Sequence, residues 1–176
     1  MNICENGFVR EMTAEEQAAA APFTPVSYDR QTSALHAVRL LLQGKGPVTE
    51  DEHIQCGALY DEWAAGSHDA GDIYTALEQV WECYQAYDNG VYPGIVPGSA
   101  AWYTFNRPMH GTTPDTARAF VQPSGSHDVY HTGEYAVYHN ALYACRQDTA
   151  FSPEEYPDAW EVQITWPTGW SSWRKR

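Results

Sequence analysis

The chain contains two stretches that carry the same pattern of residues 62 positions apart. Three pairs of identical residues share this offset: Gly71 with Gly133, Cys83 with Cys145, and Gln85 with Gln147. Each stretch also closes on an Ala-Trp pair, which ends at Trp102 in the first copy and at Trp160 in the second. Several identities in one register with a shared ending indicate a tandem duplication. We therefore expect two small units of the same fold.

The second copy, within residues 125–162, shows most clearly what this unit is. An alternating run from Tyr135 through Val137 leads into a polar turn at His139-Asn140, and a second run follows it. Alternation with period two that is interrupted by a polar turn is typical of a β-hairpin. The duplicated unit is therefore predicted to be a small antiparallel β module.

The N-terminal part of the chain is predicted to hold a hairpin and a short helix. Asn6-Gly7 lies between short apolar runs and predicts a hairpin turn within residues 1–10. Thr13 and Glu16 have the spacing of a capping box, which begins an Ala-rich helix that ends before Pro22. Residues 22–28 contain two prolines and are predicted to form a linker or bend.

Two further helices are predicted before the first β module. Apolar residues recur at helical spacing between positions 28 and 43, namely Leu35, Val38, Leu41 and Leu42. Thr49 and Glu52 form a second capping box, and the helix that it opens carries Ile54, Ala58 and Leu59 toward Trp63. We expect a helical hairpin. Two alternatives stay open for its apolar stripe: it packs on the first β module, or it associates with other copies of the chain.

The composition excludes several classes of protein. The formal net charge is −13, whereas nucleic-acid affinity needs clustered Lys and Arg, which occur only at Arg174 to Arg176. No run approaches the roughly 18 apolar residues that span a bilayer, and the N-terminus begins acidic, so neither a membrane protein nor a Sec-exported one is expected. Aromatic residues make up 14% of the chain, and Trp and Tyr suit sugar faces and protein interfaces.

The four cysteines do not indicate a disulfide framework. They are sparse for a chain of 176 residues, and none lies in a Cys-x-x-Cys pair. Cys83 and Cys145 occupy matching places in the two copies, so each is predicted to fill the same small apolar site in its own module. Free thiols of this kind suit synthesis in a reducing compartment.

At this level of detail the chain resembles a known group of proteins. Residues 56–63 followed by Gly71-Asp72-Ile73 and then residues 81–86 are similar to a segment of small bacteriophage and prophage proteins and tail-fibre C-termini. There a short helix leads into a module similar to the chitin-binding carbohydrate-binding modules of bacterial chitinases. The second copy is similar to the same module through Tyr130, residues 133–135, Tyr143, Cys145 and Ala159-Trp160. Residues 6–16 and 110–123 also resemble phage tail proteins.

The resemblance implies a fold and a partner. It implies an α+β chain in which a short N-terminal hairpin and helical segments precede two small tandem antiparallel β modules. It also implies a virion protein of the phage tail or fibre, made in the host cytoplasm, that binds cell-surface or cell-wall polysaccharide and other tail or virion proteins, and forms homo-oligomers. The expected divisions are residues 1–28 (hairpin, helix and linker), 29–62 (helical hairpin), 63–105 (first module), 106–124 (connector), 125–163 (second module) and 164–176 (Trp-rich tail).

Eight aromatic residues are candidates for glycan contact: Trp81, Tyr87, Tyr92, Trp102, Tyr143, Phe151, Tyr156 and Trp160. Trp102 and Trp160 close their copies and are better explained as core residues. Trp81 and Tyr143 are equivalent strand residues that suit either role. The other four lie in predicted loops, where an aromatic ring is harder to bury, so they are the preferred contacts.

The second copy departs from the chitin-binding pattern. Such modules place exposed aromatics, often a Trp pair, between the Cys-like position and the closing Trp, but residues 147–156 contain no Trp. This departure favours the alternative function, in which the modules serve only to pack subunits in a virion or tail.

The C-terminal tail is rich in tryptophan. Residues 164–176 contain Trp166, Trp170 and Trp173, which we expect to dock on this chain or a neighbour, or else to form a free tip that contacts a receptor.

The sequence contains no nucleophile elbow, zinc-protease motif or phosphate-binding loop. Carboxylates such as Glu50 to Glu52 cluster at predicted helix starts, where the helix dipole accounts for them.

No metal site is expected among the clustered histidines. His127, His131 and His139 lie close in sequence, but the predicted loop and strand do not bring their imidazoles onto one face. We therefore predict a protein that is not an enzyme, uses no cofactor, and binds neither nucleic acid nor membrane.

Overall fold

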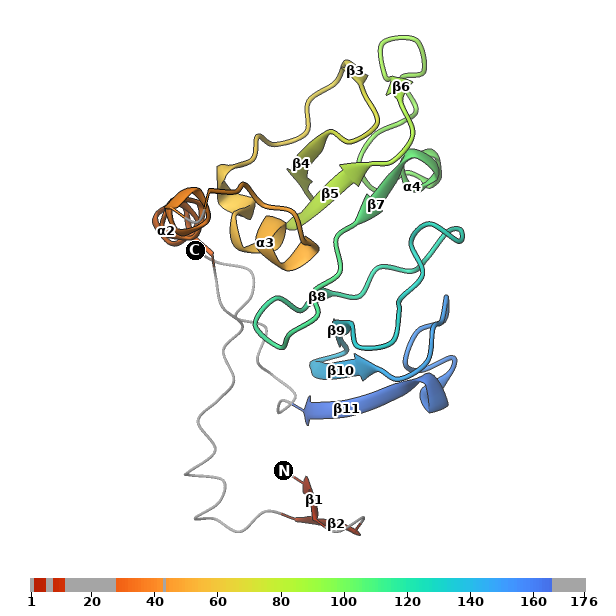
Figure 1. The fold of residues 1–176 in the computed structure, drawn as a ribbon. Helices are drawn as coiled ribbons and strands as arrows, with labels where there is room; N and C mark the ends of the chain where they lie inside the picture. Colours follow the sequence, from red (N-terminus) through yellow and green to blue (C-terminus); the bar gives the residue numbers. More distant parts are fainter. Residues whose placement is uncertain (1, 6–7, 12–27, 43, 166–176) are drawn as a thin grey trace.

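The computed structural model describes residues 2–5, 8–11, 28–42 and 44–165 (Figure 1). The fold is α+β, with N-terminal helices followed by several small antiparallel and mixed β-sheets, as the sequence predicts. The predicted capping box at Thr13 and Glu16, the Ala-rich helix and the Trp-rich end of the chain lie outside the described residues.

The N-terminal hairpin is confirmed by strand pairing. Strand β1 (Asn2–Glu5) pairs antiparallel with β2 (Phe8–Glu11), in a register that sets Asn2 opposite Glu11 and Glu5 opposite Phe8. Two residues therefore separate the paired strands, which is the loop length that favours an Asn-Gly turn.

The two helices before the first module are also present, but the second is shorter than predicted. Helix α2 covers Arg30–Leu42 and α3 covers Glu50–Gln55, and Thr49 and Glu52 form the predicted capping box at its start. The chain then tightens into a 3-10 turn, η1 (Gly57–Leu59). A Cβ at Gly57 would lie 2.9 Å from Val80 Cγ2, so only glycine allows this close approach to the first sheet.

Helix α2 points its leucine stripe away from the rest of the described protein. Leu35, Val38 and Leu41 are 65%, 51% and 70% exposed, whereas Ser33 and Leu40 are buried. Of the two alternatives for this stripe, packing on the first module is therefore wrong for these three residues. The contact with the first sheet comes instead from α3, where Ile54 packs with Val80 and Met109.

The first module is built around a sheet of three strands. Strands β4 (Ile73–Ala76), β5 (Gln79–Cys83) and β7 (Asn106–Pro108) pair antiparallel in the order β4-β5-β7. A ribbon of β3 (Ser67–His68) and β6 (Tyr87–Asp88) and the helix α4 (Ala100–Phe105) cover the sheet. Trp81 from β5 and Trp102 from α4 meet edge to face, with ring centroids 5.5 Å apart, and both are fully buried.

The second module has four strands. Strands β8 (Arg118–Ala119), β9 (Tyr135–Tyr138), β10 (Ala141–Cys145) and β11 (Trp160–Thr165) are arranged in the order β11-β10-β9-β8, with a short 3-10 turn, η2 (Pro157–Ala159), before the last strand. The pair β8–β9 is parallel and the others are antiparallel. Tyr130 and Trp160 form the centre of its core, with ring centroids 5.2 Å apart.

The two hairpins correspond at the level of individual hydrogen bonds. The hairpins β4–β5 and β9–β10 have the same lengths and the same offset of 62 residues. Gly71 N donates to Cys83 O at 2.7 Å, and Gly133 N donates to Cys145 O at 2.8 Å. Both glycines have positive φ, +96° and +95°, which side chains rarely tolerate. The repeated glycines are therefore required by the backbone.

The two-residue turns of the hairpins also match. Leu77 and Glu78 in the first turn, and His139 and Asn140 in the second, all have positive φ. Positive φ at both central residues defines the type I′ turn, whose twist fits a two-residue hairpin. Leu77 is an unusual residue for this position, so the backbone of the unit overrides local preference in the first copy.

The pairing of the third strand in each sheet gives a different alignment of the two copies from the one that the sequence predicts. Cys83 pairs with Asn106, whereas Cys145 pairs with Trp160, so Asn106 and not Trp102 is the counterpart of Trp160. Trp102 lies on α4, before the strand begins. The shared Ala-Trp ending is therefore not a match in three-dimensional register, although both tryptophans are core residues.

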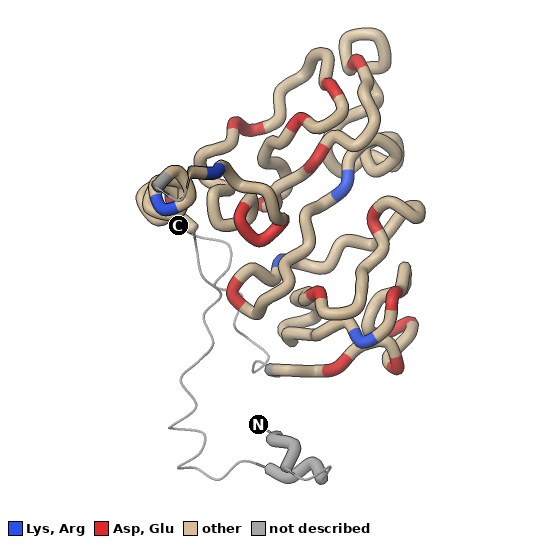
Figure 2. Tube along the Cα trace, viewed as in Figure 1, with Lys and Arg blue, Asp and Glu red and all other residues tan. Residues whose placement is uncertain are grey.

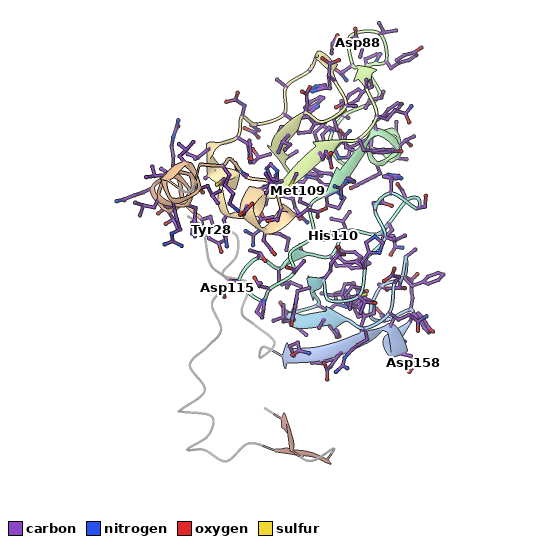
Figure 3. The ribbon with its side chains drawn as sticks, viewed as in Figure 1. Tyr28, Asp88, Met109, His110, Asp115 and Asp158 are labelled. Carbon is purple, nitrogen blue, oxygen red and sulfur yellow. The ribbon has the colours of Figure 1, made fainter. Side chains whose placement is uncertain are left out.

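The segment predicted to be a connector, residues 106–124, belongs to both sheets. Its first residues form β7 of the first sheet, and β8 forms an edge of the second. Between them the ribbon passes the labelled residues Met109 and His110 (Figure 3). The first module therefore extends past residue 105, and little of this segment is free linker.

Carboxylates of α3 hold this connecting segment in place. Glu50 accepts from His110 N and pairs with Arg107 Nη1 at 2.7 Å. Asp51 accepts from Thr112 N at 2.9 Å, and from the hydroxyls of Thr112 and Thr116. The helix dipole was the predicted reason for these acidic residues, but two of them also bind a segment that lies about sixty residues further along the chain.

Candidate functional site

Four of the eight predicted contact residues are buried. Trp81, Tyr87, Trp102 and Trp160 have between 0% and 7% of their surface exposed. The core interpretation of Trp102 and Trp160 is therefore confirmed. The interpretation of Tyr87 as an exposed loop residue is wrong, because Tyr87 lies on β6 and its hydroxyl accepts a hydrogen bond from Trp63 Nε1 at 2.8 Å. None of these four rings presents a free face to a sugar.

The other four predicted residues reach the surface at different places. Tyr92 is 64% exposed in the first module, and Phe151 is 55% exposed in the second. Tyr143 and Tyr156 are half-buried, with Tyr143 near Trp160 and Tyr156 edge to face with Phe151 at 6.5 Å. The eight residues thus do not form one site. Each module instead has its own surface groove.

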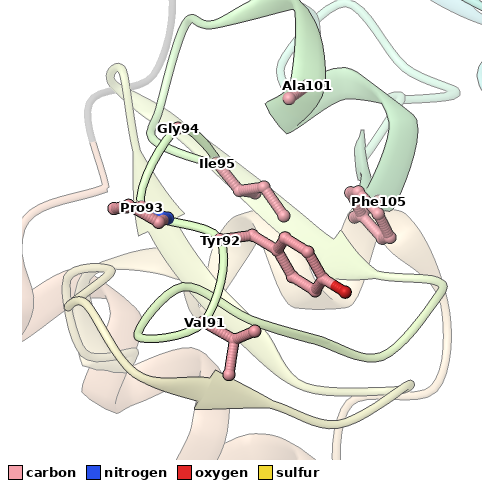
Figure 4. Close-up of a pocket in the computed structure, with 7 residues that line it drawn as sticks. All are labelled: Val91, Tyr92, Pro93, Gly94, Ile95, Ala101 and Phe105. Carbon is pink, nitrogen blue, oxygen red and sulfur yellow. The ribbon is translucent and has the colours of Figure 1, made fainter.

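The groove of the first module, which we call the Tyr92 groove, is lined by Val91, Tyr92, Pro93, Gly94, Ile95, Ala101 and Phe105 and has a volume of about 490 Å³ (Figure 4). Its wall is the loop between β6 and α4 together with one face of α4. The loop is shaped by hydrogen bonds: Asp88 Oδ1 accepts from Gly90 N at 2.7 Å, and Asn89 Nδ2 donates to Ile95 O at 2.7 Å.

The chemistry of the Tyr92 groove is almost entirely apolar. Ile95 is buried at its base, while Val91 and Tyr92 are mostly exposed at its rim. No charged side chain lines it. Such a surface suits an apolar side chain of a partner better than the many hydroxyls of a sugar, which need hydrogen-bonding groups around the ring.

The groove of the second module, which we call the Tyr138 groove, has different chemistry. It has a volume of about 400 Å³ and is lined by Phe120, Gln122, Tyr138, Ser152, Glu154 and Glu155. These residues come from the end of β9, the segment after β8, and the loop between β10 and β11. Aromatic, amide, hydroxyl and carboxylate groups therefore meet in one open groove.

Aromatic rings form one wall of the Tyr138 groove. Phe120 packs edge to face with Tyr138, at 5.5 Å between ring centroids. It also stacks on buried Tyr130 at 5.0 Å and meets Trp160 edge to face at 6.0 Å. The His139 ring stacks on Tyr138 at 4.0 Å, with 26° between the planes. Because Tyr130 is part of the core, the wall is supported from behind.

Hydrogen bonds fix the polar side of the groove. The Tyr138 hydroxyl donates to Glu154 Oε2 at 3.1 Å, and His139 Nδ1 lies 3.9 Å from the same oxygen. Glu155 Oε2 accepts from Ser152 N at 3.0 Å and from Ser152 Oγ at 2.9 Å, and these bonds lower the pKa of Glu155. Gln122 Nε2 donates to Ala150 O at 2.8 Å. The carboxylate of Glu154 stays 73% exposed and available to a ligand.

The six residues of the Tyr138 groove were not among the sequence candidates. The stretch 147–156, where a chitin-binding module would place its contacts, does supply three of them. Glu154-Glu155 after Pro153 has the sequence pattern of a helix start, in which carboxylates favour the first turn, but the structure forms a turn there. Tyr138 is the last residue of strand β9, directly before the positive-φ turn. This position at the end of the hairpin is the sequence signal that favours a partly exposed ring at Tyr138.

The described part of the chain gives no sign of a metal site. No group of three or more His, Cys, Asp or Glu residues is arranged there to hold a metal ion. His127 Nε2 interacts with Tyr103 O at 3.0 Å, and His131 Nδ1 with Asp148 Oδ2 at 2.9 Å, so these histidines have separate structural partners. Among the described helices, none is long and apolar enough to cross a membrane.

The family and sequence comparisons give no relative. No protein-family model matches the chain, and no curated protein sequence matches it. Function is therefore inferred from the two grooves.

Proposed function

We propose that this protein binds glycans without catalysis, and that the Tyr138 groove of the second module makes the contact. The observation that carries the proposal is the arrangement of one groove, in which the aromatic wall of Phe120 and Tyr138 stands beside the exposed carboxylate of Glu154. The predicted candidates Phe151 and Tyr156 lie in the loop that supplies the polar side of this groove.

The chemistry of the groove matches that of a pyranose ring. The C–H groups on one sugar face pack against an aromatic ring, and the hydroxyls at the rim take hydrogen bonds from nearby polar groups. Glu154 and Glu155 offer acceptors, and Ser152 and Gln122 are polar side chains at the same edge. Because the two carboxylates repel anions, the groove favours neutral glycans over phosphate-bearing or uronic polymers.

The biological setting that we propose is the tail or tail fibre of a bacteriophage, with a cell-surface or cell-wall polysaccharide as the target. The support for this setting is the resemblance of residues 56–63 and 81–86 to phage proteins. In such a particle the protein also contacts other tail proteins, and it is made in the host cytoplasm.

Retention on insoluble glycans tests the proposal. The purified chain is incubated with insoluble chitin and with Gram-positive cell walls, together with the variants Tyr138→Ala, Glu154→Gln and Tyr92→Ala. We expect wild type and Tyr92→Ala to be retained, and the Glu154 variant to bind about tenfold more weakly, which corresponds to about 1.4 kcal/mol. Tyr138→Ala should bind more weakly still, and its thermal unfolding shows whether it remains folded.

Two results would overturn the proposal. One is failure of both surfaces to retain the wild type. The other is loss of binding by Tyr92→Ala while Glu154→Gln is retained, since the contact would then lie in the first module.

A second candidate function is structural, in which the modules pack subunits together in a virion. The specific observation in its favour is the Tyr92 groove, whose apolar rim is exposed without the polar groups that a sugar needs. The two functions are compatible because they use different modules.

A further inference from the structure

Charge is divided unevenly between neighbouring parts of the chain (Figure 2). Residues 30–49 contain three basic residues, Arg30, Arg39 and Lys45, and no carboxylate. Residues 50–108, which form α3 and the first module through β7, contain ten carboxylates and one basic residue, Arg107, which pairs with Glu50 and Glu82. The molecule therefore joins a basic helix to an acidic module.

The basic helix also carries an exposed apolar face. Leu35, Val38 and Leu41 are spaced at i, i+3 and i+6, so they lie along one side of α2, and each is more than half exposed. Arg39 is exposed next to them. An apolar stripe of this size beside a basic residue is typical of a helix that docks into a groove.

The acidic module carries an exposed apolar groove. The rim of the Tyr92 groove is formed by Val91 and Tyr92, with the exposed Val96 from the same loop. Helix α2 and the elements β6 and α4 that frame this loop lie at opposite ends of the first module (Figure 1). The helix of one molecule therefore lies far from its own groove, while a second copy offers an equivalent groove.

We infer that copies of this chain associate head to tail, with the exposed face of α2 in one copy bound in the Tyr92 groove of the next. Both halves of this contact are present in every copy: an apolar stripe with a basic flank, and an apolar groove in an acidic module. A contact between two different surfaces does not close on itself in a dimer, so it extends to a ring or a filament. This inference names the partner for the structural role proposed above, and it does not depend on glycan binding.

A symmetric contact between two α2 faces is disfavoured by charge. In an antiparallel pair of these faces, Arg39 of one copy would approach Arg39 of the other, and like charges at an interface are unfavourable. In the head-to-tail contact the same arginine approaches a module that has ten carboxylates within residues 50–108 against one basic residue, Arg107, which is already paired with Glu50 and Glu82. We therefore expect the association to weaken as the salt concentration rises.

Sedimentation velocity across a range of protein concentrations tests this inference. We compare the wild type with Leu35→Glu on α2 and with Tyr92→Glu in the groove. Both side chains are exposed, so both variants should stay folded. We expect each variant alone to self-associate at least tenfold more weakly than the wild type. Val162→Glu, at a similarly exposed apolar residue of β11, should leave association unchanged.

Mixing the two variants gives the decisive result. Each retains one intact surface, so a mixture of Leu35→Glu and Tyr92→Glu should form a one-to-one dimer and nothing larger. A wild type that stays monomeric at every concentration overturns the inference. So does loss of association in the Leu35 variant alone with no dimer in the mixture, because that result indicates a symmetric contact. Retention of Tyr92→Glu on glycan reports separately on the second module.

Discussion

The two modules share a hairpin and differ in the loop that follows it. Hairpins β4–β5 and β9–β10 agree in register, in turn type and in the hydrogen bonds that Gly71 and Gly133 donate. The loops after them, residues 84–105 and 146–159, differ in length and build grooves of opposite character, one apolar and one acidic. The two modules thus agree in the part that the backbone geometry requires and differ in the surface loops, where binding residues are most often found.

The length of that loop also changes how each core is filled. The longer loop of the first module has room for α4, which carries Trp102 over the fully buried Trp81. The shorter loop of the second module contains only η2, and the large ring comes from Trp160 on the third strand. Equivalent strand positions therefore have different burial in the two modules.

The largest expected difference is at the equivalent residues Trp81 and Tyr143. Trp81 is fully buried, so Trp81→Ala should lower the free energy of unfolding by about 3–5 kcal/mol. Tyr143 is half-buried, and Tyr143→Ala should lower it by about 1–2 kcal/mol. Urea denaturation of the two variants measures both values. Equal losses would contradict the difference in burial between Trp81 and Tyr143.

A smaller effect is expected where the modules are joined. Asp51→Ala removes an acceptor shared by Thr112 N and the hydroxyls of Thr112 and Thr116, and should lower the free energy of unfolding by about 2 kcal/mol. Asp61→Ala, at an exposed carboxylate of the same chain, is the matched control and should change it by less than about 0.5 kcal/mol. If both variants have the same free energy of unfolding, Asp51 of α3 does not stabilise the segment between the modules.

The equivalent cysteines Cys83 and Cys145 should behave alike, which sharpens the comparison of the two modules. Both are buried, Cys83 Sγ donates to Gln85 O and Cys145 Sγ donates to Gln147 O. Cys83→Ala and Cys145→Ala should each cost about 1 kcal/mol of stability, measured by thermal unfolding. Burial raises the pKa of each thiol to about 11, so iodoacetamide should label both slowly at pH 8 in the native protein. Fast labelling of one alone would contradict the shared environment.

The smallest effect concerns an ion pair found in the second module only. The hydrogen bond from His131 lowers the pKa of Asp148 to about 2, and the same bond raises the pKa of His131. The contribution of Asp148 to the free energy of unfolding is complete above its unfolded pKa of about 3.9, and it is lost as the pH falls toward 2. The contribution of His131 is complete below its unfolded pKa of about 6.5, and it is lost as the pH rises through its folded pKa.

The variant Asp148→Asn checks this pair. It should flatten the dependence of thermal stability on pH at both ends of this window. Ala86 occupies the equivalent place in the first module, so Ala86→Ser, at an exposed position, is the control and should leave the pH profile unchanged. A profile of Asp148→Asn that matches the wild type would show that the exposed pair contributes nothing.

The sequence predicts which local elements form better than it predicts which face of each element is buried. The hairpins, the glycine pair and the capping box at Thr49 follow from short-range rules of turn and cap geometry, and they are confirmed. The outward direction of Leu35 does not follow from such rules, because helical spacing marks a stripe without showing which side meets the core. Here the small residue Ser33 and Leu40 take the inner side.

The candidate site is predicted only in part, for a physical reason. The interval 147–156 could be assigned to ligand contact, but the groove also needs Phe120 and Gln122, which reach it through the parallel pairing of β8 with β9. A parallel pair between a segment predicted as connector and a hairpin strand leaves no short-range pattern. The matching of Trp102 with Trp160 failed for a similar reason, since loop length shifts the third strand relative to the repeat.

We propose that the two modules share a hairpin but that only the second carries a glycan site. A titration of the isotope-labelled protein with a soluble chitin hexasaccharide, followed by backbone and side-chain amide NMR signals, tests it most directly. We expect shifts at the end of β9, at residues 150–156 and at the Gln122 side-chain amide, with residues 89–105 unchanged. Shifts centred on residues 89–105, or no shifts in either module, would contradict it.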